Sequence, residues 1–221
     1  MARSVALIHT VASLVPTFNE LMRELMPDTV VFHFVDESLL TVTRQVGHIT
    51  PQTRRRLLGH VASAQELGVA AALVTCSSVG PAVEDARKFL DIPLVRVDEA
   101  MAERAVRAGR RIGVVATLRS TLDPTRDLIE RTSAEAGIAN EVVAQLCDGA
   151  FEAASRGDTD RHDALVAEEI LALSRVVDVL VLAQASMARA LPRLGDQAPT
   201  IPVLTSPRSA VERLRDVLAA V

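Results

Sequence analysis

The chain of 221 residues repeats its own short motifs at an offset close to half its length. The matching segments are Ile8–Ser13 with Val115–Ser120, Leu73–Ser78 with Val181–Ser186, and Val35-Asp36 with Cys147-Asp148, at offsets of 107, 108 and 112 residues. Short Val/Leu segments resemble one another, so any single match could arise by chance. Three matches in one order and at nearly one offset predict two structural halves of similar fold.

Short apolar runs recur in both halves, and each is followed by a polar loop and a helical pattern. The runs are Val5–His9, Val30–Val35, Ala70–Thr75, Leu94–Val97, Ile112–Ala116, Val142–Leu146, Val179–Ala183 and Ile201–Leu204. Runs this short and this rich in Val, Leu, Ile and Ala are typical of strands buried on both faces of a parallel sheet. Helix starts are predicted at Thr50-Pro51, Gly80-Pro81 and Asp123-Pro124. The alternation predicts an α/β fold of two pseudo-symmetric, Rossmann-like lobes with parallel sheets.

The repeat also predicts the domain boundaries. We expect a first lobe over 1–97 joined by 201–221, and a second lobe over 98–200. In this arrangement the last strand, 201–204, and the helix 207–220 return to cover the first lobe. Ligands of open α/β sheets bind outside the carboxyl ends of the strands. We therefore expect the active site in a cleft between the lobes, at these strand ends.

Composition excludes several classes of partner. Lys and Arg number 24 against 28 Asp and Glu, and Trp and Tyr are absent, so we expect no nucleic acid partner. No apolar run reaches the ~18 residues of a membrane-spanning helix. The five histidines lack metal-ligand spacing, so no metal is expected, and no Gly-rich dinucleotide fingerprint is present. Two cysteines cannot form a disulfide framework, which favours a reducing, cytoplasmic location.

Cys76 is the strongest candidate for chemistry. It follows a predicted strand, and the hydroxyls of Ser77 and Ser78 come before the helix start at Gly80-Pro81. Backbone N–H groups at a helix start favour an anion and lower the pKa of a thiol. The alternative is a buried, inert cysteine. Cys147 has two interpretations as well, a displaced second thiol or a buried structural cysteine.

Hydroxyl groups follow the first strand of each predicted half. Thr10 and Ser13 occupy this place in the first half, and Thr117 and Ser120 in the second. Together with loop amides, such hydroxyls can hold a carboxylate without a fixed positive charge. The alternative for each is ordinary capping of the loop.

Two further strand-end residues carry open alternatives. His9 is either a proton donor that points into the cleft or a strand-end histidine with its hydrogen bonds satisfied inside the protein. Asp36 is expected to cap a helix, contact a ligand or orient another group.

These motifs resemble those of the aspartate/glutamate racemase superfamily, which includes hydantoin racemases, maleate isomerases and arylmalonate decarboxylases. The resemblance spans nearly the whole chain and rests on Thr75-Cys76-Ser77-Ser78 and on Ala116–Ser120. It implies two facing α/β lobes, no cofactor, and a cysteine after a strand in each half that moves a proton next to a carboxylate. In the second half the cysteine position falls on Gln184, two residues before Ser186. An amide cannot transfer a proton as a thiol does, so two-cysteine racemisation is not expected.

The resemblance therefore implies a cofactor-independent isomerase, racemase or lyase (decarboxylase) that acts at the carbon next to the carboxylate of a small acid. Cys76 would be catalytic, and the residues expected to bind substrate are His9, Thr10, Ser13, Ser77, Ser78, Thr117, Ser120, Gln184 and Ser186. The alternative is a non-catalytic protein of the same fold that binds a small carboxylate. Uninterrupted apolar helix faces with few aromatic residues predict a homodimer.

Overall fold

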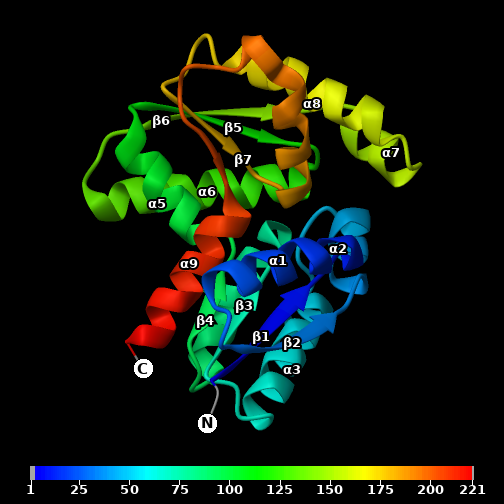
Figure 1. Ribbon diagram of the computed structural model, residues 1–221, viewed down its shortest axis with the longest axis vertical. Helices are drawn as coiled ribbons and strands as arrows, with labels where there is room; N and C mark the ends of the chain where they lie inside the picture. The colour runs from blue at the N-terminus through cyan, green and yellow to red at the C-terminus, as the bar shows by residue number, and fades with distance from the viewer. Residues whose placement is uncertain (1–2, 221) are drawn as a thin grey trace. The chain divides into compact units, whose positions relative to one another are not determined.

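The computed structural model describes residues 3–220, which form two four-stranded parallel sheets (Figure 1). The first sheet has the strand order β2-β1-β3-β4 and the second has the order β6-β5-β7-β8. The strands are β1 Ser4–His9, β2 Val30–Val35, β3 Ala71–Val74, β4 Leu94–Arg96, β5 Arg111–Ala116, β6 Glu141–Leu146, β7 Val179–Leu182 and β8 Val203–Thr205. The predicted α/β fold with two similar halves is confirmed.

The register of the strands repeats along with their order. Ser4 pairs with Val30 at the start of β1, and Arg111 pairs with Glu141 at the start of β5. The backbone N–H of Thr75 donates to Ile8 at 3.0 Å, and that of Ala183 donates to Val115 at 3.0 Å. β1, β2, β3 and β4 thus correspond residue by residue to β5, β6, β7 and β8.

The first compact unit comprises Met1–Ala100 and Pro207–Val221. Its sheet carries helices on both faces (Figure 1). Val5 and Leu7 face α1 (Val15–Leu25) and α9 (Ser206–Ala219), and the alternate residues Ala6 and Ile8 face the other helices. Those helices are α2 (Ser38–Val46), α3 (Pro51–Glu66) and α4 (Gly80–Ala86). Short 3-10 turns complete the unit as η1 (Ala12–Leu14), η2 (Ser77–Val79) and η3 (Arg87–Phe89).

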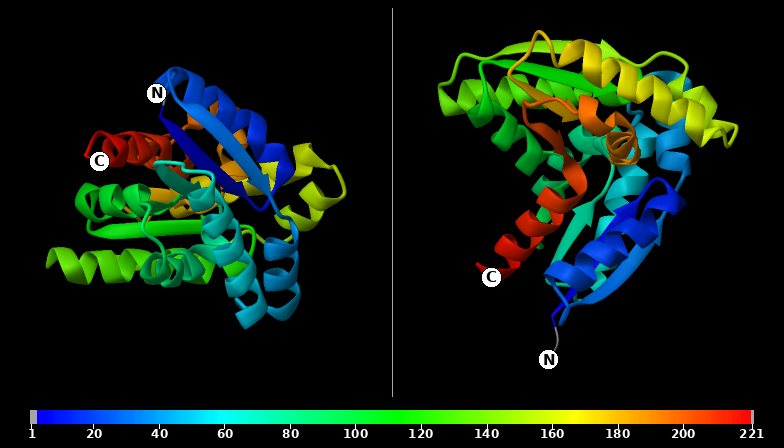
Figure 2. Two further views of the ribbon diagram at one scale, coloured as in Figure 1. Left: turned by 90° about the horizontal axis from the view of Figure 1, so that it is seen from below. Right: turned by 45° about the horizontal axis from the view of Figure 1, so that its top comes forward.

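The second compact unit comprises Met101–Ser206 and is built in the same way. Ile112 and Val114 face α5 (Glu99–Ala108) and α6 (Arg119–Ala136), and Val115 faces the opposite layer. That layer is formed by α7 (Ala150–Ser155), α8 (Thr159–Leu173) and η4 (Ala185–Gln197). The further views of Figure 2 show the helices on either side of each sheet. Alternation of side chains along each strand therefore places apolar residues against helices on both faces.

Two sequence-based expectations about elements are wrong. The strand at 201–204 was expected to cover the first lobe, but β8 pairs with β7 through Leu180 with Val203 and completes the second sheet. The helix expected to open at Asp123-Pro124 begins at Arg119 instead. Pro124 lies in its second turn, where a proline removes only one helical hydrogen bond.

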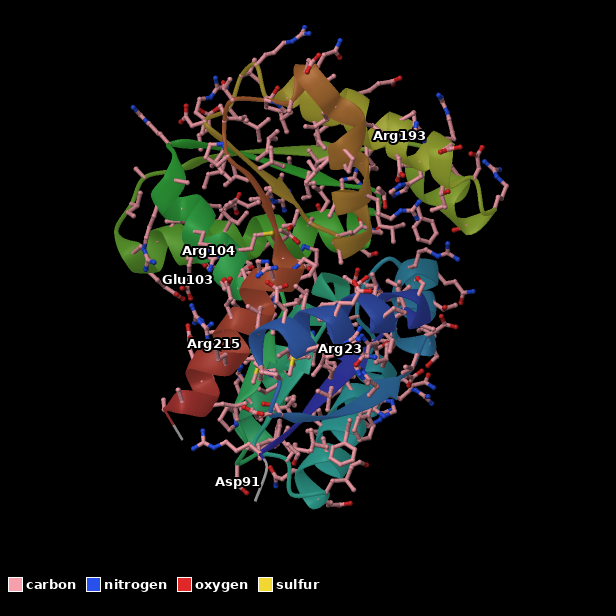
Figure 3. All side chains as sticks on the ribbon, in the orientation of Figure 1. Arg23, Asp91, Glu103, Arg104, Arg193 and Arg215 are labelled. Atoms are coloured by element: carbon pink, nitrogen blue, oxygen red, sulfur yellow. The ribbon has the colours of Figure 1, made fainter. Side chains whose placement is uncertain are left out.

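The surfaces of both units carry charged side chains. Arg23 on α1, Arg193 on η4 and Arg215 on α9 are exposed and point outward (Figure 3). Among residues 3–220, no helix has the length and apolarity needed to cross a membrane.

Candidate active site

Cys76 lies just beyond the carboxyl end of β3. The strand ends at Val74, and Cys76 keeps extended backbone angles before the turn η2 begins at Ser77. Helix α4 follows directly from Gly80, with Pro81 in its first turn, as the sequence predicts. The chain therefore changes from strand to helix around the thiol, and loop amides are presented to the sulfur.

The Cys76 sulfur is surrounded by hydrogen-bond donors from its own unit. The backbone N–H groups of Ser78 and Val79 and the hydroxyl of Ser78 bond to it, and the Thr10 hydroxyl interacts with it from the end of β1. Thr10 Oγ1 is buried and makes no hydrogen bond of standard geometry to any other described residue. Cys76 itself is partly exposed. The thiol thus lies within a shell of polar groups in a residue that is partly exposed.

The acidity of Cys76 differs from the sequence-based expectation. Burial raises the pKa of its thiol, and the contacts with Thr10, Ser78 and Val79 only partly offset this effect. The expected lowering of the pKa is therefore wrong, because desolvation of the thiolate outweighs the loop amides. Cys76 is a protonated thiol at neutral pH, which suits a proton donor better than a free nucleophile.

The remaining candidates of the first unit lie close by in the fold. Ser77 and Ser78 are buried in η2, whereas Ser13 lies exposed in η1. His9, the last residue of β1, is fully buried and has both ring nitrogens hydrogen-bonded inside the unit. Burial, reinforced by His33, lowers the pKa of His9 from 6.5 to about 4. A neutral His9 supplies no positive charge to stabilise a thiolate.

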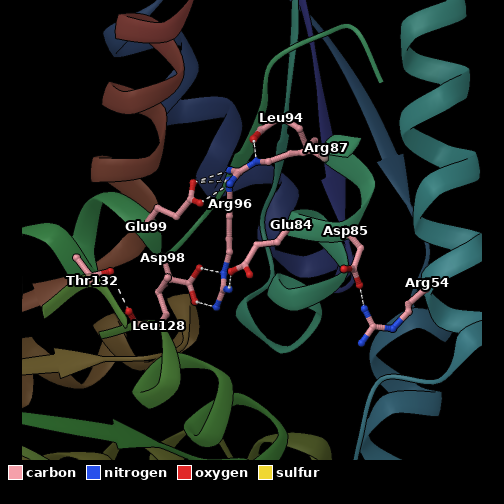
Figure 4. A network of polar contacts seen from close by, with 10 residues as sticks. All are labelled: Arg54, Glu84, Asp85, Arg87, Leu94, Arg96, Asp98, Glu99, Leu128 and Thr132. Atoms are coloured by element: carbon pink, nitrogen blue, oxygen red, sulfur yellow. Dashed lines mark hydrogen bonds and ion pairs between the residues drawn. The ribbon is translucent and has the colours of Figure 1, made fainter. Parts of the chain in front are cut away.

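A buried ion-pair network holds the helix that follows Cys76 (Figure 4). The Arg96 guanidinium is fully buried and donates to both carboxylate oxygens of Asp98, at 2.7 and 3.0 Å, and also to Glu84. It lies so close to Gly80 that a Cβ atom there would be 2.2 Å from Arg96 Nε. Glycine at the start of α4 therefore makes room for the cation.

The end of β2 is fixed by Asp36. One of its oxygens accepts from the Ser38 backbone N–H at 3.1 Å, and the other accepts from Arg56 and His60 at 2.7 Å each. Against the opposing effect of burial, these bonds hold the pKa of Asp36 well below its usual range. Both oxygens are thus occupied, and of the three roles open to Asp36 the structure shows the orientation of other groups, namely Ser38 in the first turn of α2 and the side chains of Arg56 and His60.

In the second unit, Gln184 and Thr117 form a pair at the corresponding strand ends. Gln184 Oε1 accepts hydrogen bonds from the Thr117 backbone N–H at 2.6 Å and from its hydroxyl at 3.0 Å. Because a backbone N–H can only donate, the Gln184 atom that faces it must be the oxygen. The amide NH₂ group is therefore turned away from Thr117 and is oriented as a donor.

Three further residues of the second unit were candidates from the sequence. Ser120 lies in the first turn of α6, and its buried Oγ has no hydrogen-bond partner among residues 3–220. Ser186 is partly exposed in the first turn of η4. Cys147 is buried, and burial together with Glu169, Asp148 and Glu168 raises its pKa to about 12. The structure therefore agrees with a structural rather than a reactive Cys147.

Sequence reasoning missed the groups that support the thiol. Arg96 and His33 stand in predicted strands, where a charged or titratable residue gives no hint of its partners. The amide of Val79 has no side-chain signal at all. The one local clue was Gly80, because a glycine at a helix start often marks a close approach. Within residues 3–220, no three metal-ligating side chains come together.

A scan against family models matches residues 6–214 to the model described as Asp/Glu/Hydantoin racemase. No curated protein matches the sequence.

Solved structures of racemases resemble the chain over almost its full length. A glutamate racemase isoform from Bacillus anthracis matches with a TM-score of 0.73 and 16% identity, over 99% of this chain and 82% of that one. Allantoin racemase from Klebsiella pneumoniae matches with a TM-score of 0.72 and 18% identity, over 99% of this chain and 88% of that one. The aspartate racemase of Picrophilus torridus matches with a TM-score of 0.71 and 13% identity, over 98% of this chain and 94% of that one. At these identities the likeness shows a shared fold.

Proposed function

The chain belongs to the Asp/Glu/hydantoin racemase family, enzymes of the racemase and isomerase class, and on this premise we propose that Cys76 transfers a proton at the carbon next to the carboxylate of a small acid. The observation that carries the proposal is the shell of donors around the Cys76 sulfur. The same donors stabilise the thiolate that forms when the proton leaves. The chain's own thiol supplies the proton, so the step needs no cofactor.

The raised pKa of Cys76 sets the direction of this proton transfer. In the resting enzyme the S–H bond is intact, so the thiol meets the substrate as an acid. A substrate carbanion forms when CO₂ leaves or when Cys76, after losing its proton to solvent, takes the C–H proton as a thiolate. This carbanion, stabilised as an enediolate by its carboxylate, takes a proton from sulfur and forms a C–H bond. The resulting thiolate regains a proton from solvent, or from the substrate carbon in the reverse direction.

Proton delivery from one thiol reaches one face of the carbon. Gln184 stands where the repeat would place a second thiol, and its amide acts neither as an acid nor as a base at neutral pH. One-sided isomerisation, or decarboxylation followed by protonation, therefore fits the residues better than two-base racemisation. In decarboxylation the C–CO₂ bond breaks, CO₂ leaves with the bond electrons remaining on the substrate, and Cys76 protonates the carbon.

Substrate binding is assigned to the hydroxyl and amide donors at the strand ends. In the first unit these are Thr10, Ser77, Ser78 and the exposed Ser13. Thr10 fits best, because its buried hydroxyl lacks a partner of standard geometry among the described residues and lies at the sulfur.

The second unit contributes donors of the same kind in this proposal. Gln184 would offer its oriented NH₂ group to a developing oxyanion, and Thr117, Ser120 and Ser186 would serve the carboxylate. That the loops of both units serve one substrate stays a prediction. The expected cytoplasmic location and the homodimer also stay predictions.

Deuterium exchange tests the proposed reaction. The enzyme is incubated in D₂O with a panel of amino acids, hydantoins and malonates, and deuterium at the carbon next to the carboxylate is measured by NMR. We expect incorporation with at least one class for the wild type and none for Cys76→Ala. Binding without exchange by the wild type would instead support the non-catalytic alternative. Equal exchange by Cys76→Ala would refute the role of the thiol.

A further inference from the structure

A chain of hydrogen-bonded side chains runs below Cys76 on the α1 face of the first sheet. Thr75 Oγ1 lies 3.0 Å from His9 Nδ1, His9 Nε2 lies 2.9 Å from His33 Nδ1, and His33 Nε2 lies 2.8 Å from Asn19 Oδ1. The two imidazole rings stack at 5.1 Å, and the edge of Phe18 packs on His9 at 5.6 Å. The chain thus links three strands to helix α1.

Asn19 fixes the direction of these hydrogen bonds. Its carbonyl oxygen accepts from His33 Nε2, so the other ring nitrogen of a neutral His33 must accept from His9 Nε2. His9 Nδ1 is then an acceptor, and the Thr75 hydroxyl shares its proton between this nitrogen at 3.0 Å and the Ile8 carbonyl oxygen at 3.2 Å, both on β1. Burial lowers the pKa of both rings, which keeps them neutral at pH 7 and this direction intact. The Thr75 side chain is therefore pinned to the end of β1.

The second unit has no counterpart of three of these polar groups, those of His9, Thr75 and His33. By strand register, His9 corresponds to Ala116, because these residues end β1 and β5, and Thr75 corresponds to Ala183. His33 pairs with Leu7 in the first sheet, and the matching pair in the second sheet is Val114 with Ala144. Alanine therefore occupies all three corresponding positions in the second sheet, which has the same strand order and register.

The fold itself therefore does not require these hydrogen-bonded side chains. They occur in the unit that carries Cys76. Burying imidazoles and a hydroxyl costs free energy unless they are hydrogen-bonded, and apolar side chains in their place need no such partners. Thr75 directly precedes Cys76, and His9 directly precedes Thr10, whose hydroxyl interacts with the sulfur. The His9 ring bonded to Thr75 consequently ties together the two strand ends that carry Thr10 and Cys76.

We propose that His33 and His9 are positioning residues that, through Thr75, hold the Cys76 thiol against Thr10 and the η2 amides. The inference rests on the proposed role of Cys76 but assigns to the histidines a function that acts through another residue. Neither ring needs to touch substrate. Loss of the chain lets the two strand ends shift relative to each other, and small misplacements of reacting groups reduce rates strongly.

The test compares Thr75→Val, which removes only the hydroxyl, with Thr75→Ser, which retains it. The second-order rate of Cys76 alkylation by iodoacetamide is measured at pH 8 by peptide mapping, with Tm recorded beside it. The alkylation rate of Thr75→Val should differ from that of the wild type by about tenfold, the factor that corresponds to one lost buried hydrogen bond. Thr75→Ser should keep the wild-type rate. His33→Ala, which installs the residue of the second unit, should shift the rate in the same direction.

A matched control separates positioning from general loosening of the unit. Thr43 is a buried threonine of α2 whose hydroxyl donates to Leu39 at 2.7 Å. It takes no part in the hydrogen bonds that join Thr75, His9, His33 and Asn19. Thr43→Val should lower Tm without changing the alkylation rate. Wild-type alkylation rates in both Thr75→Val and His33→Ala would overturn the proposal.

Turnover provides a second readout that a merely structural role would not reproduce. Thr75→Val should lower kcat about tenfold with KM little changed, and Thr75→Ser should restore kcat. Alkylation needs no substrate, so failure of the positioning proposal is distinguishable from failure of the proposed function. If Cys76→Ala retains turnover, the proposed function fails and the positioning proposal does not.

Discussion

The two units have one backbone plan and different chemistry at the same place. In the first unit, the residues after β1 and β3 bring the Thr10 hydroxyl to the Cys76 thiol. In the second, the residues after β5 and β7 bring the Thr117 hydroxyl to the Gln184 amide at 3.0 Å. Strand order and register are the same in both sheets. The difference between the strand end that carries a thiol and the one that carries an amide thus lies in side chains.

The supporting residues differ in the same sense. The first unit has the hydrogen-bonded His9 at the end of β1 and the buried Arg96 at the end of β4, whereas Ala116 and Thr205 occupy the corresponding places of the second unit. Buried polar groups are costly unless every bond is made. The comparison teaches that the first unit holds buried polar groups with their bonds made where the chemistry is proposed, and that the second unit has none at these two positions.

The largest expected effect comes from removing the thiol. Cys76→Ala should reduce turnover by about 10³-fold, within the range lost when a general acid is removed. Cys147→Ala is the matched control, because that thiol is buried and its pKa is raised to about 12. It should leave turnover within about twofold of wild type, as for a group outside the chemistry. Steady-state kinetics of both variants measure these effects. A larger loss of turnover in Cys147→Ala than in Cys76→Ala would contradict the assignment of the reaction to Cys76.

The next effect concerns the glycine beside Arg96. Gly80→Ala places a Cβ 2.2 Å from Arg96 Nε, although the corresponding residue of the second unit, Ala188, is already an alanine. Displacing the guanidinium from Asp98 should cost about 4 kcal/mol in the free energy of unfolding, as for a broken buried ion pair. Urea denaturation measures this loss.

Gly59→Ala in α3 serves as the control for this substitution. No atom lies within 4 Å of its added Cβ, so helix propensity should raise the free energy of unfolding by about 0.5 to 1 kcal/mol. Equal effects of Gly59→Ala and Gly80→Ala would show that the Arg96 contact carries no strain.

A smaller effect is expected from acidification. The pKa of His9 is about 4 in the folded chain against 6.5 for a free histidine, so the unfolded chain binds the proton more readily. Stability is therefore full above pH 6.5 and falls as the pH drops from 6.5 to about 4, by up to about 3 kcal/mol. Urea denaturation across this range checks it. His9→Ala should flatten the pH dependence, and an unchanged slope would contradict the assignment to His9.

The smallest effect concerns assembly. The edge strand β2 exposes Val30, Phe32 and Val35, at 46%, 39% and 46%, whereas the first residue of the corresponding edge strand β6 is Glu141. Apolar surface of this kind favours association with a second copy. Light scattering at micromolar concentration should give a dimer mass for the wild type and a monomer mass for Phe32→Glu. A monomeric wild type would remove the prediction.

The sequence predicts the sheets and the passage from strand to helix around Cys76 well, because both have local signals. Short Val/Leu runs and the motif around Cys76 are read from consecutive residues. The placement of β8 beside β7, the partner of His9 and the partner of Arg96 depend on contacts between distant segments. Such contacts have no local pattern, so they escaped prediction. The raised pKa of Cys76 was missed for the same reason, because burial is a property of the packed unit.

The stereochemistry of protonation tests the single-thiol account most directly. With the substrate found in the exchange panel, product is formed in D₂O and the configuration of its deuterated carbon is determined. The account predicts one enantiomer from the wild type and deuterium on both faces from Gln184→Cys, which restores a second thiol. A racemic wild-type product, with no change in Gln184→Cys, would contradict it.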